Sequence, residues 1–155
     1  MLHRWTAPLL VLALCAATPG QATGQSAHEP RKSTAGTLGQ NVPNPFNPDT
    51  TIPFTIGDDT CAGGRERHSV TLKVFNVLAQ LVAIPVLQSA TVAGATGDAP
   101  AGKPLANLTL GCGSFQAFWD GKFMNTGRPA AAGVYVYQLI IDGRPVVVRK
   151  MVIAK

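Results

Sequence analysis

The sequence predicts an all-β fold, an antiparallel β-sandwich of about seven strands that follows a signal peptide and a disordered linker. Three observations lead to this prediction. Several short segments alternate apolar and polar side chains with a period of two. Clusters of Gly, Pro, Asn and Asp, which favour turns, separate these segments. No helical periodicity follows the N-terminal apolar run, which favours two packed sheets over a mixed fold.

The first 22 residues have the pattern of a secretory signal peptide. His3 and Arg4 form a short charged region, and the apolar run at residues 7–17 is followed by Thr-Pro-Gly. This run has about half of the ~20 residues that a bilayer-spanning helix needs, so we expect no transmembrane anchor. Residues 23–37 contain almost no large apolar side chains, which predicts a disordered linker.

The number of cysteines predicts one disulfide. If Cys15 leaves with the signal peptide, Cys61 and Cys112 remain in a compartment where thiols oxidise. A bridge between them closes a loop of roughly 50 residues, which is worth about 4 kcal/mol in the chain-entropy model. A metal pair completed by His68 is the alternative, but no Cys-x-x-Cys or His-x-His spacing supports it. We therefore expect neither a metal nor a cofactor.

Residues 38–155 suit a single domain with one hydrophobic core. Its first segment, residues 38–48, alternates prolines with asparagines, which predicts a stiff extended ribbon whose Phe46 enters the core. Residues 51–56 place every second side chain on an apolar face, as in a half-buried strand. Because Pro53 has no N–H to donate, we expect this strand at a sheet edge or at an irregularity.

Further strands are predicted in chain order at residues 70–75, 81–85, 114–119, 133–141 and 145–154. Residues 86–112 are dominated by Ala, Gly and Pro in their middle part and predict a long loop excursion that Cys112 helps to hold. Asp142-Gly143 predicts a type I′ hairpin turn, because both central positions of that turn need a positive φ. Trp119 is expected in the core.

The sequence predicts a protein that is not an enzyme. Gly-x-Ser-x-Gly, His-Glu-x-x-His and a phosphate-binding glycine loop are all absent. His68 follows Arg65, Glu66 and Arg67, and we interpret it as a solvated loop residue rather than a base. The basic residues behind the formal charge of +5 are scattered along the chain, so we expect no binding to nucleic acid.

A calcium site is a further alternative. Asp58 and Asp59 are adjacent, and they could share an ion with Asp98 or Asp120, since calcium prefers several oxygen ligands. The acidic residues do not have the spacing of a known calcium-binding loop, so we do not expect an ion there.

Three motifs occur in the order found in one protein family. They are Asn-Pro-Phe-Asn-Pro at residues 44–48, Trp-Asp-Gly at 119–121, and Gly-Val-Tyr-x-Tyr at 133–137 with a lysine in the last strand. On these motifs, residues 38–155 resemble the type A C-terminal sorting domain of type IX secretion, which is related to the Ig-like domain of the flagellar hook-capping protein. The matching residues are Asn44, Pro45, Phe46, Asn47, Pro48, Trp119, Asp120, Gly121, Gly133, Tyr135, Tyr137 and Lys150.

The resemblance implies an Ig-like sandwich and a non-enzymatic exported protein whose C-terminal domain is a sorting signal for surface display or release. The implied partners are the type IX secretion machinery of the outer membrane and, in some members, surface lipopolysaccharide. The implied location is secreted or on the cell surface, reached through the periplasm. We expect the last hairpin, residues 133–155, to be recognised, because edge strands can pair with other chains. The alternative is an Ig-like assembly or binding module of the hook-capping type, periplasmic or extracellular.

The chain departs from the family pattern in three places. Ala79 stands where the family has glycine, which predicts that the turn at residues 76–80 has changed shape. Residues 86–112 lengthen a connection that is direct in the family. Residues 23–37 are too short and polar to be the catalytic domain that usually precedes a sorting domain. Whether the chain is a fragment of a longer gene stays open.

Overall fold

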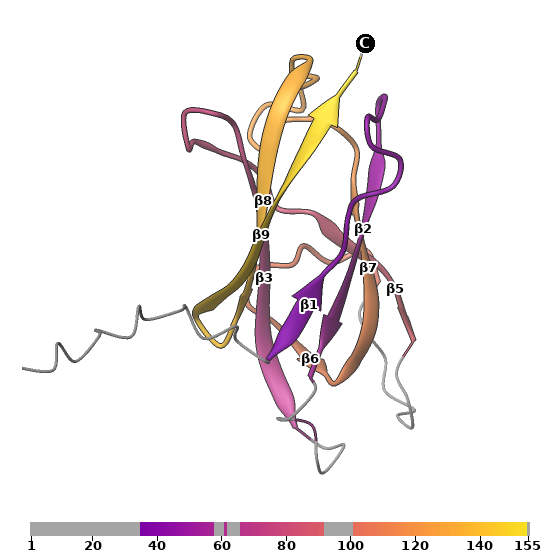
Figure 1. The fold of residues 1–155 in the computed structure, drawn as a ribbon, viewed down its shortest axis with the longest axis vertical. Helices are drawn as coiled ribbons and strands as arrows, with labels where there is room; N and C mark the ends of the chain where they lie inside the picture. Colours follow the sequence, from indigo (N-terminus) through magenta and orange to yellow (C-terminus); the bar gives the residue numbers. More distant parts are fainter. Residues whose placement is uncertain (1–34, 58–60, 62–65, 92–100, 155) are drawn as a thin grey trace, which may run out of the picture. The chain divides into compact units, whose positions relative to one another are not determined.

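The structure is a computed structural model that describes residues 35–57, 61, 66–91 and 101–154 (Figure 1). The predicted signal peptide and most of the predicted linker lie outside the described residues. Within the described ranges, no helix has the length and apolar character needed to cross a bilayer.

Two antiparallel sheets form the domain, and the apolar core lies between them (Figure 1). The first sheet runs, in spatial order, through β1 (Gly36–Leu38), β2 (Thr50–Ile56), β7 (Gly113–Trp119) and β5 (Val86–Thr91). The second runs through β4 (Leu81–Ala83), β3 (Arg67–Phe75), β8 (Gly133–Ile141) and β9 (Arg144–Ile153), and β6 (Leu108–Gly111) also pairs with β3. The predicted all-β antiparallel sandwich is confirmed.

The described residues hold nine strands rather than about seven. The first reason is that the predicted loop excursion at residues 86–112 contains β5 and β6, each of which inserts an apolar side chain, Leu87 and Leu110, into the core. The second is that the end of the predicted linker forms β1, which pairs with β2. The Ala, Gly and Pro content of the excursion concealed two strands that tertiary pairing stabilises.

The strand that contains Pro53 is not at a sheet edge. β2 lies between β1 and β7, and Pro53 lies opposite Gly39, just beyond the end of β1. The Gly39 amide donates to the Pro53 carbonyl over 2.7 Å, but proline has no N–H to return the bond. The Tyr137 hydroxyl donates to the Gly39 carbonyl instead, over 2.8 Å. A side chain from the opposite sheet thus supplies the donor that the proline lacks.

The family-like motifs meet in the core. Phe46, Trp119 and Tyr135 are each at most 5% exposed. The Trp119 ring makes edge-to-face contacts with both of the other rings, with centroids 5.6 Å apart in each pair. The Trp119 indole N–H donates to the Lys122 carbonyl over 2.9 Å, so its polar group is satisfied. Trp119 is a core residue, as predicted.

The ribbon that carries Phe46 is fixed to the last strand. The Phe46 amide donates to the Val152 carbonyl over 3.0 Å, and the Ala154 amide donates to the Phe46 carbonyl over 2.9 Å. The Asn44 side-chain oxygen accepts from the Val152 amide over 2.9 Å. A Cβ added to Gly121 would overlap the Pro48 carbonyl, so only glycine fits this position in the Trp-Asp-Gly turn. These motif residues therefore have structural roles.

Two turns test the backbone predictions. Asp142 and Gly143 have φ values of 51° and 74°, as a type I′ turn requires, so that prediction is confirmed. Ala79 has a φ of 57°, so the turn keeps the left-handed residue although glycine is absent. The expected change of shape is wrong there. Alanine in this conformation costs about 1–2 kcal/mol.

Trp119→Ala is expected to lower the free energy of unfolding by about 3–5 kcal/mol, because it removes a fully packed aromatic side chain that touches two other rings. Urea denaturation followed by circular dichroism measures the loss. A change below about 1 kcal/mol would show that the ring is not part of the core in solution.

Ala79→Gly is expected to raise the free energy of unfolding by roughly 0.5–1 kcal/mol, because the relieved strain exceeds the extra chain entropy of glycine. Ala106→Gly is the matched control, since Ala106 is also exposed but has no positive φ. The control should lose about 0.5–1 kcal/mol. Equal losses in both variants would contradict a left-handed Ala79.

Candidate functional site

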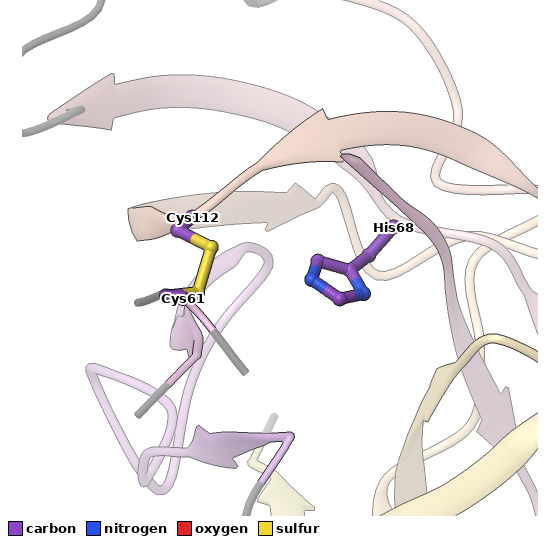
Figure 2. A group of neighbouring side chains, drawn as sticks. All are labelled: Cys61, His68 and Cys112. Carbon is purple, nitrogen blue, oxygen red and sulfur yellow. A yellow bond between two sulfur atoms is a disulfide. The ribbon is translucent and has the colours of Figure 1, made fainter. Parts of the chain in front are cut away.

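The candidate site lies where the chain crosses from one sheet to the other. Cys112 is the single residue between β6 in the second sheet and β7 in the first. Ile56, at the end of β2, pairs with Gly113, so the segment that follows β2 starts beside Cys112. His68 on β3 pairs with Leu110 on β6, two residues before Cys112. Strand register therefore brings three distant segments to one end of the sandwich (Figure 2).

Cys61 and Cys112 form a disulfide, the pairing that the sequence predicts. Their Cα atoms are 6.1 Å apart, and their sequence separation is 51. Both cysteines are partly exposed. The Cys61 sulfur also lies 3.9 Å from the Ile56 carbonyl oxygen, which a thiol at this position could use as an acceptor.

Gly57 makes room for the sulfur pair. It has a φ of 93°, in the left-handed region. A Cβ at this position would overlap the Cys61 sulfur and lie 3.3 Å from the Cys112 sulfur. Any other residue would therefore collide with the disulfide as well as carry backbone strain.

His68 is buried, which corrects its interpretation as a solvated loop residue. It is 8% exposed and lies on β3, on the same inward face as Val70, Leu72 and Val74. The alternation of inward and outward side chains along β3 includes His68, which lies two residues before Val70. This alternation is the sequence signal that could have revealed the burial of His68. The charged residues that precede His68 led to its interpretation as part of a solvated loop.

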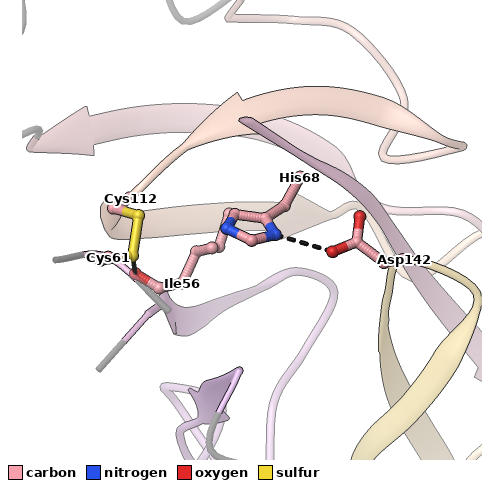
Figure 3. Close-up of a disulfide and its surroundings, with 5 residues drawn as sticks. All are labelled: Ile56, Cys61, His68, Cys112 and Asp142. Atoms are coloured by element: carbon pink, nitrogen blue, oxygen red, sulfur yellow. Dashed lines mark hydrogen bonds and ion pairs between the residues drawn. A yellow bond between two sulfur atoms is a disulfide. The ribbon is translucent and has the colours of Figure 1, made fainter. Parts of the chain in front are cut away.

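Asp142 fixes the imidazole of His68. Its Oδ2 is 2.7 Å from His68 Nδ1, and its Oδ1 accepts from the Ser69 amide over 2.8 Å (Figure 3). The hydrogen bond from His68 is the largest cause of a pKa of Asp142 below its ordinary value, and the Ser69 amide and the charge of Arg144 act in the same direction. An ionised Asp142 accepts a hydrogen bond from Nδ1–H, and in this tautomer the neutral imidazole carries its lone pair on Nε2.

The other ring nitrogen of His68 is buried without a partner. Among the described residues, Nε2 of His68 has no hydrogen-bond partner and almost no contact with solvent. The two sulfurs are close to this ring: one ligand atom each of Cys61, His68 and Cys112 lies within 4.8 Å of the others. Figure 2 shows the ring beside the disulfide. An unpaired buried acceptor costs about 1–3 kcal/mol, so this arrangement calls for a functional explanation.

The remaining predicted residues do not belong to this site. Asp58, Asp59 and Asp98 lie outside the described residues. Asp120 forms an ion pair with Lys122 over 3.3 Å and accepts from the Lys122 amide, so it stabilises its own turn. The Lys150 carbonyl accepts from the Gln40 side chain over 3.1 Å on the last strand.

The tyrosines of the third motif also have structural partners. The Tyr135 hydroxyl donates to the Ala131 carbonyl over 2.9 Å, at the start of the last hairpin. The Tyr137 hydroxyl joins the two sheets through Gly39 and also accepts from the Asn41 amide over 3.1 Å. Burial raises the pKa of both tyrosines above the ordinary value, so both hydroxyls stay protonated at neutral pH and can donate.

Comparison with known proteins gives one structural likeness. No protein-family model matches the chain, and no curated protein matches it. A solved structure with some similarity is that of the Pseudomonas fluorescens alkylpurine DNA glycosylase AlkC bound to DNA containing an abasic site analog, at 13% sequence identity and a TM-score of 0.45. The match covers 79% of this chain but 31% of that one, so this chain spans about a third of its length.

This comparison corrects two expectations from the sequence. The predicted function was a non-enzymatic sorting signal or an assembly module, whereas the protein with some structural similarity is an enzyme, a DNA glycosylase. Both the predicted function and the exclusion of an enzyme are therefore withdrawn. A likeness of this size transfers neither the glycosylase activity nor its DNA to this chain.

Other expectations stay predictions. Neither the structure nor the comparisons test the predicted evolutionary relationship with type IX sorting domains. The same holds for the type IX machinery and lipopolysaccharide as partners, for the absence of a nucleic-acid partner, and for the location outside the cell.

Gly57→Ala is expected to prevent complete disulfide formation and to lower the free energy of unfolding by about 2–4 kcal/mol. The reason is that the new methyl group occupies the space of the sulfur pair. Gly102→Ala is the matched control: its φ of 81° imposes similar strain, but nothing lies within 4 Å of the added methyl group. Thiol labelling of the denatured, unreduced proteins should find free thiols in the Gly57 variant alone. An absence of free thiols in both variants would contradict the close approach of Gly57 to the sulfur pair.

Proposed function

We propose that this chain is an exported protein whose Cys61–Cys112 disulfide is a reversible redox centre, and that His68 and Asp142 stabilise its reduced form. The observation that carries the proposal is the buried Nε2 of His68, which has no partner among the described residues and lies beside the sulfurs. A disulfide that served only to stabilise the loop would gain nothing from this nitrogen.

The redox states differ in how this nitrogen is paired. In the disulfide form the sulfurs carry no proton, so Nε2 has nothing to accept. In the dithiol form an S–H can donate to Nε2, while Nδ1 keeps its bond to Asp142. Reduction therefore gives a partner to a buried acceptor that lacks one in the disulfide form. The reduction equilibrium at this site consequently lies further toward the dithiol than that of a disulfide without such a histidine.

The chemistry is a two-electron exchange with an external dithiol. One thiolate of the dithiol attacks a protein sulfur, the S–S bond breaks, and the other protein sulfur leaves as a thiolate that takes up a proton. The second thiol of the reductant then resolves the mixed disulfide. The protein gains two electrons and two protons, and the external dithiol becomes a disulfide. Partial exposure of both cysteines permits the attack.

An extracytoplasmic location is part of the proposal. The predicted signal peptide delivers the chain to a compartment where Cys61 and Cys112 can pair. We propose an evolutionary relationship with type IX sorting domains and hook-capping Ig-like domains on the sequence motifs alone. Any contact with the type IX machinery or with lipopolysaccharide is proposed on the same basis.

His68→Leu tests the proposal, because it removes the lone pair and keeps an apolar side chain in the core. We expect the equilibrium constant for reduction of the folded protein to fall about tenfold, the value of one hydrogen bond, which is about 30 mV for two electrons. Titration with mixtures of a dithiol and its disulfide measures the constant, while circular dichroism reports that the fold is intact.

Leu110→Val is the control, since Leu110 pairs with His68 and loses core volume without a change in polar groups. This variant should keep the reduction equilibrium of the original chain. If thiols appear only when the protein unfolds, or if His68→Leu leaves the constant unchanged, the disulfide is structural and the proposal fails.

A further inference from the structure

Reduction would leave three metal-binding groups at one point. The ligand atoms of Cys61, His68 and Cys112 lie within 4.8 Å of one another. Around a tetrahedral zinc ion, with Zn–S near 2.3 Å and Zn–N near 2.0 Å, ligand atoms are roughly 3.5–3.8 Å apart. The sulfurs would have to separate by about 2 Å from their bonded positions, which rotation about the two cysteine side chains can supply.

We propose that the reduced protein binds one Zn²⁺ through Cys61, His68 and Cys112, and that formation of the disulfide excludes the ion. This proposal rests on the proposed function in one respect, since the disulfide must open for the ion to enter. It goes further by assigning a metal site to the reduced form.

The second observation is the orientation of His68. Its Nδ1 is held by Asp142 over 2.7 Å, and its Nε2 is buried and without a partner among the described residues. Histidines that bind zinc commonly have this arrangement, with a carboxylate on one nitrogen and the metal on the other. The carboxylate fixes the ring and leaves the lone pair in place for a metal, so no rearrangement of the imidazole is needed.

The donor set selects the kind of metal. Two thiolates and one imidazole suit zinc and similar soft or borderline ions, whereas calcium and magnesium prefer oxygen ligands. Two thiolates also neutralise the charge of a divalent ion, which favours binding in a partly buried site. With three protein ligands, the fourth position of a tetrahedral zinc is open to water or another small ligand.

Reduction of the disulfide precedes metal binding. A reductant such as a phosphine transfers two electrons to the S–S bond, and with one water gives two thiols and the phosphine oxide. Zn²⁺ then displaces the two thiol protons. An oxidant that removes two electrons restores the disulfide and releases the ion.

The experiment uses the full exported chain, reduced with a phosphine without oxygen and titrated with Co²⁺ as a spectroscopic substitute for zinc. We expect one equivalent to bind, with the thiolate-to-cobalt absorption of a two-thiolate site and the visible bands of tetrahedral coordination. Added Zn²⁺ should displace the cobalt and protect both thiols from alkylation. The oxidised chain should show no such absorption.

Two variants test the assignment. His68→Gln keeps both thiols and should weaken cobalt binding at least 100-fold. Asp142→Asn keeps His68 itself but replaces the carboxylate that orients its ring, and should weaken binding about 10-fold to 100-fold. His28→Gln, outside the described residues, is the matched control and should bind like the original chain. Equal affinity of the His68 and His28 variants would overturn the site.

The two proposals fail separately. Zinc binding by the reduced chain together with a reduction equilibrium that ignores His68 would retain the metal site and reject the redox role. A shift in that equilibrium without stoichiometric cobalt binding would do the reverse. If the reduced chain unfolds, refolding on addition of Zn²⁺ supports the site, and a chain that stays unfolded in excess Zn²⁺ overturns it.

Discussion

The hydrogen bond between Asp142 and His68 is the contact on which the candidate site depends. It joins the β8–β9 turn to the start of β3 over 2.7 Å. The turn requires a residue with positive φ that can accept hydrogen bonds, and aspartate meets both demands. The same carboxylate holds the imidazole, so Nε2 is left beside the sulfurs. Asp142, which the sequence predicts as a hairpin turn residue, therefore also orients the imidazole of His68.

The motifs that predict a resemblance to sorting domains have a different physical basis. Phe46, Trp119 and Tyr135 pack into one aromatic cluster, and Gly121 is required where the turn approaches the Pro48 carbonyl. These residues hold the ribbon, the turn and the last hairpin together by packing. They indicate an architecture, and an architecture can carry unrelated functions. The site at the disulfide lies outside these motifs, so its chemistry has to be argued from its own residues.

Redox state and metal binding compete for the same atoms at this site. With the disulfide formed, both sulfurs are bonded to each other and a buried nitrogen lacks a partner among the described residues. With the disulfide opened, that nitrogen can accept from a thiol or bind an ion shared with both sulfurs. Gly57 permits the first state by keeping the space beside the sulfurs free. Each state satisfies a different set of groups, which is the physical requirement for a switch.

The sequence by itself determined the fold class, most strands, the type I′ turn and the pairing of Cys61 with Cys112, because alternation, turn chemistry and cysteine number are local or countable. It did not reveal β5 and β6, since their apolar residues are few and only pairing with β7 and β3 orders them. Nor did it place His68 beside the sulfurs. That arrangement depends on the registers of β3 with β6 and of β2 with β7, which are set by packing between segments far apart in the chain.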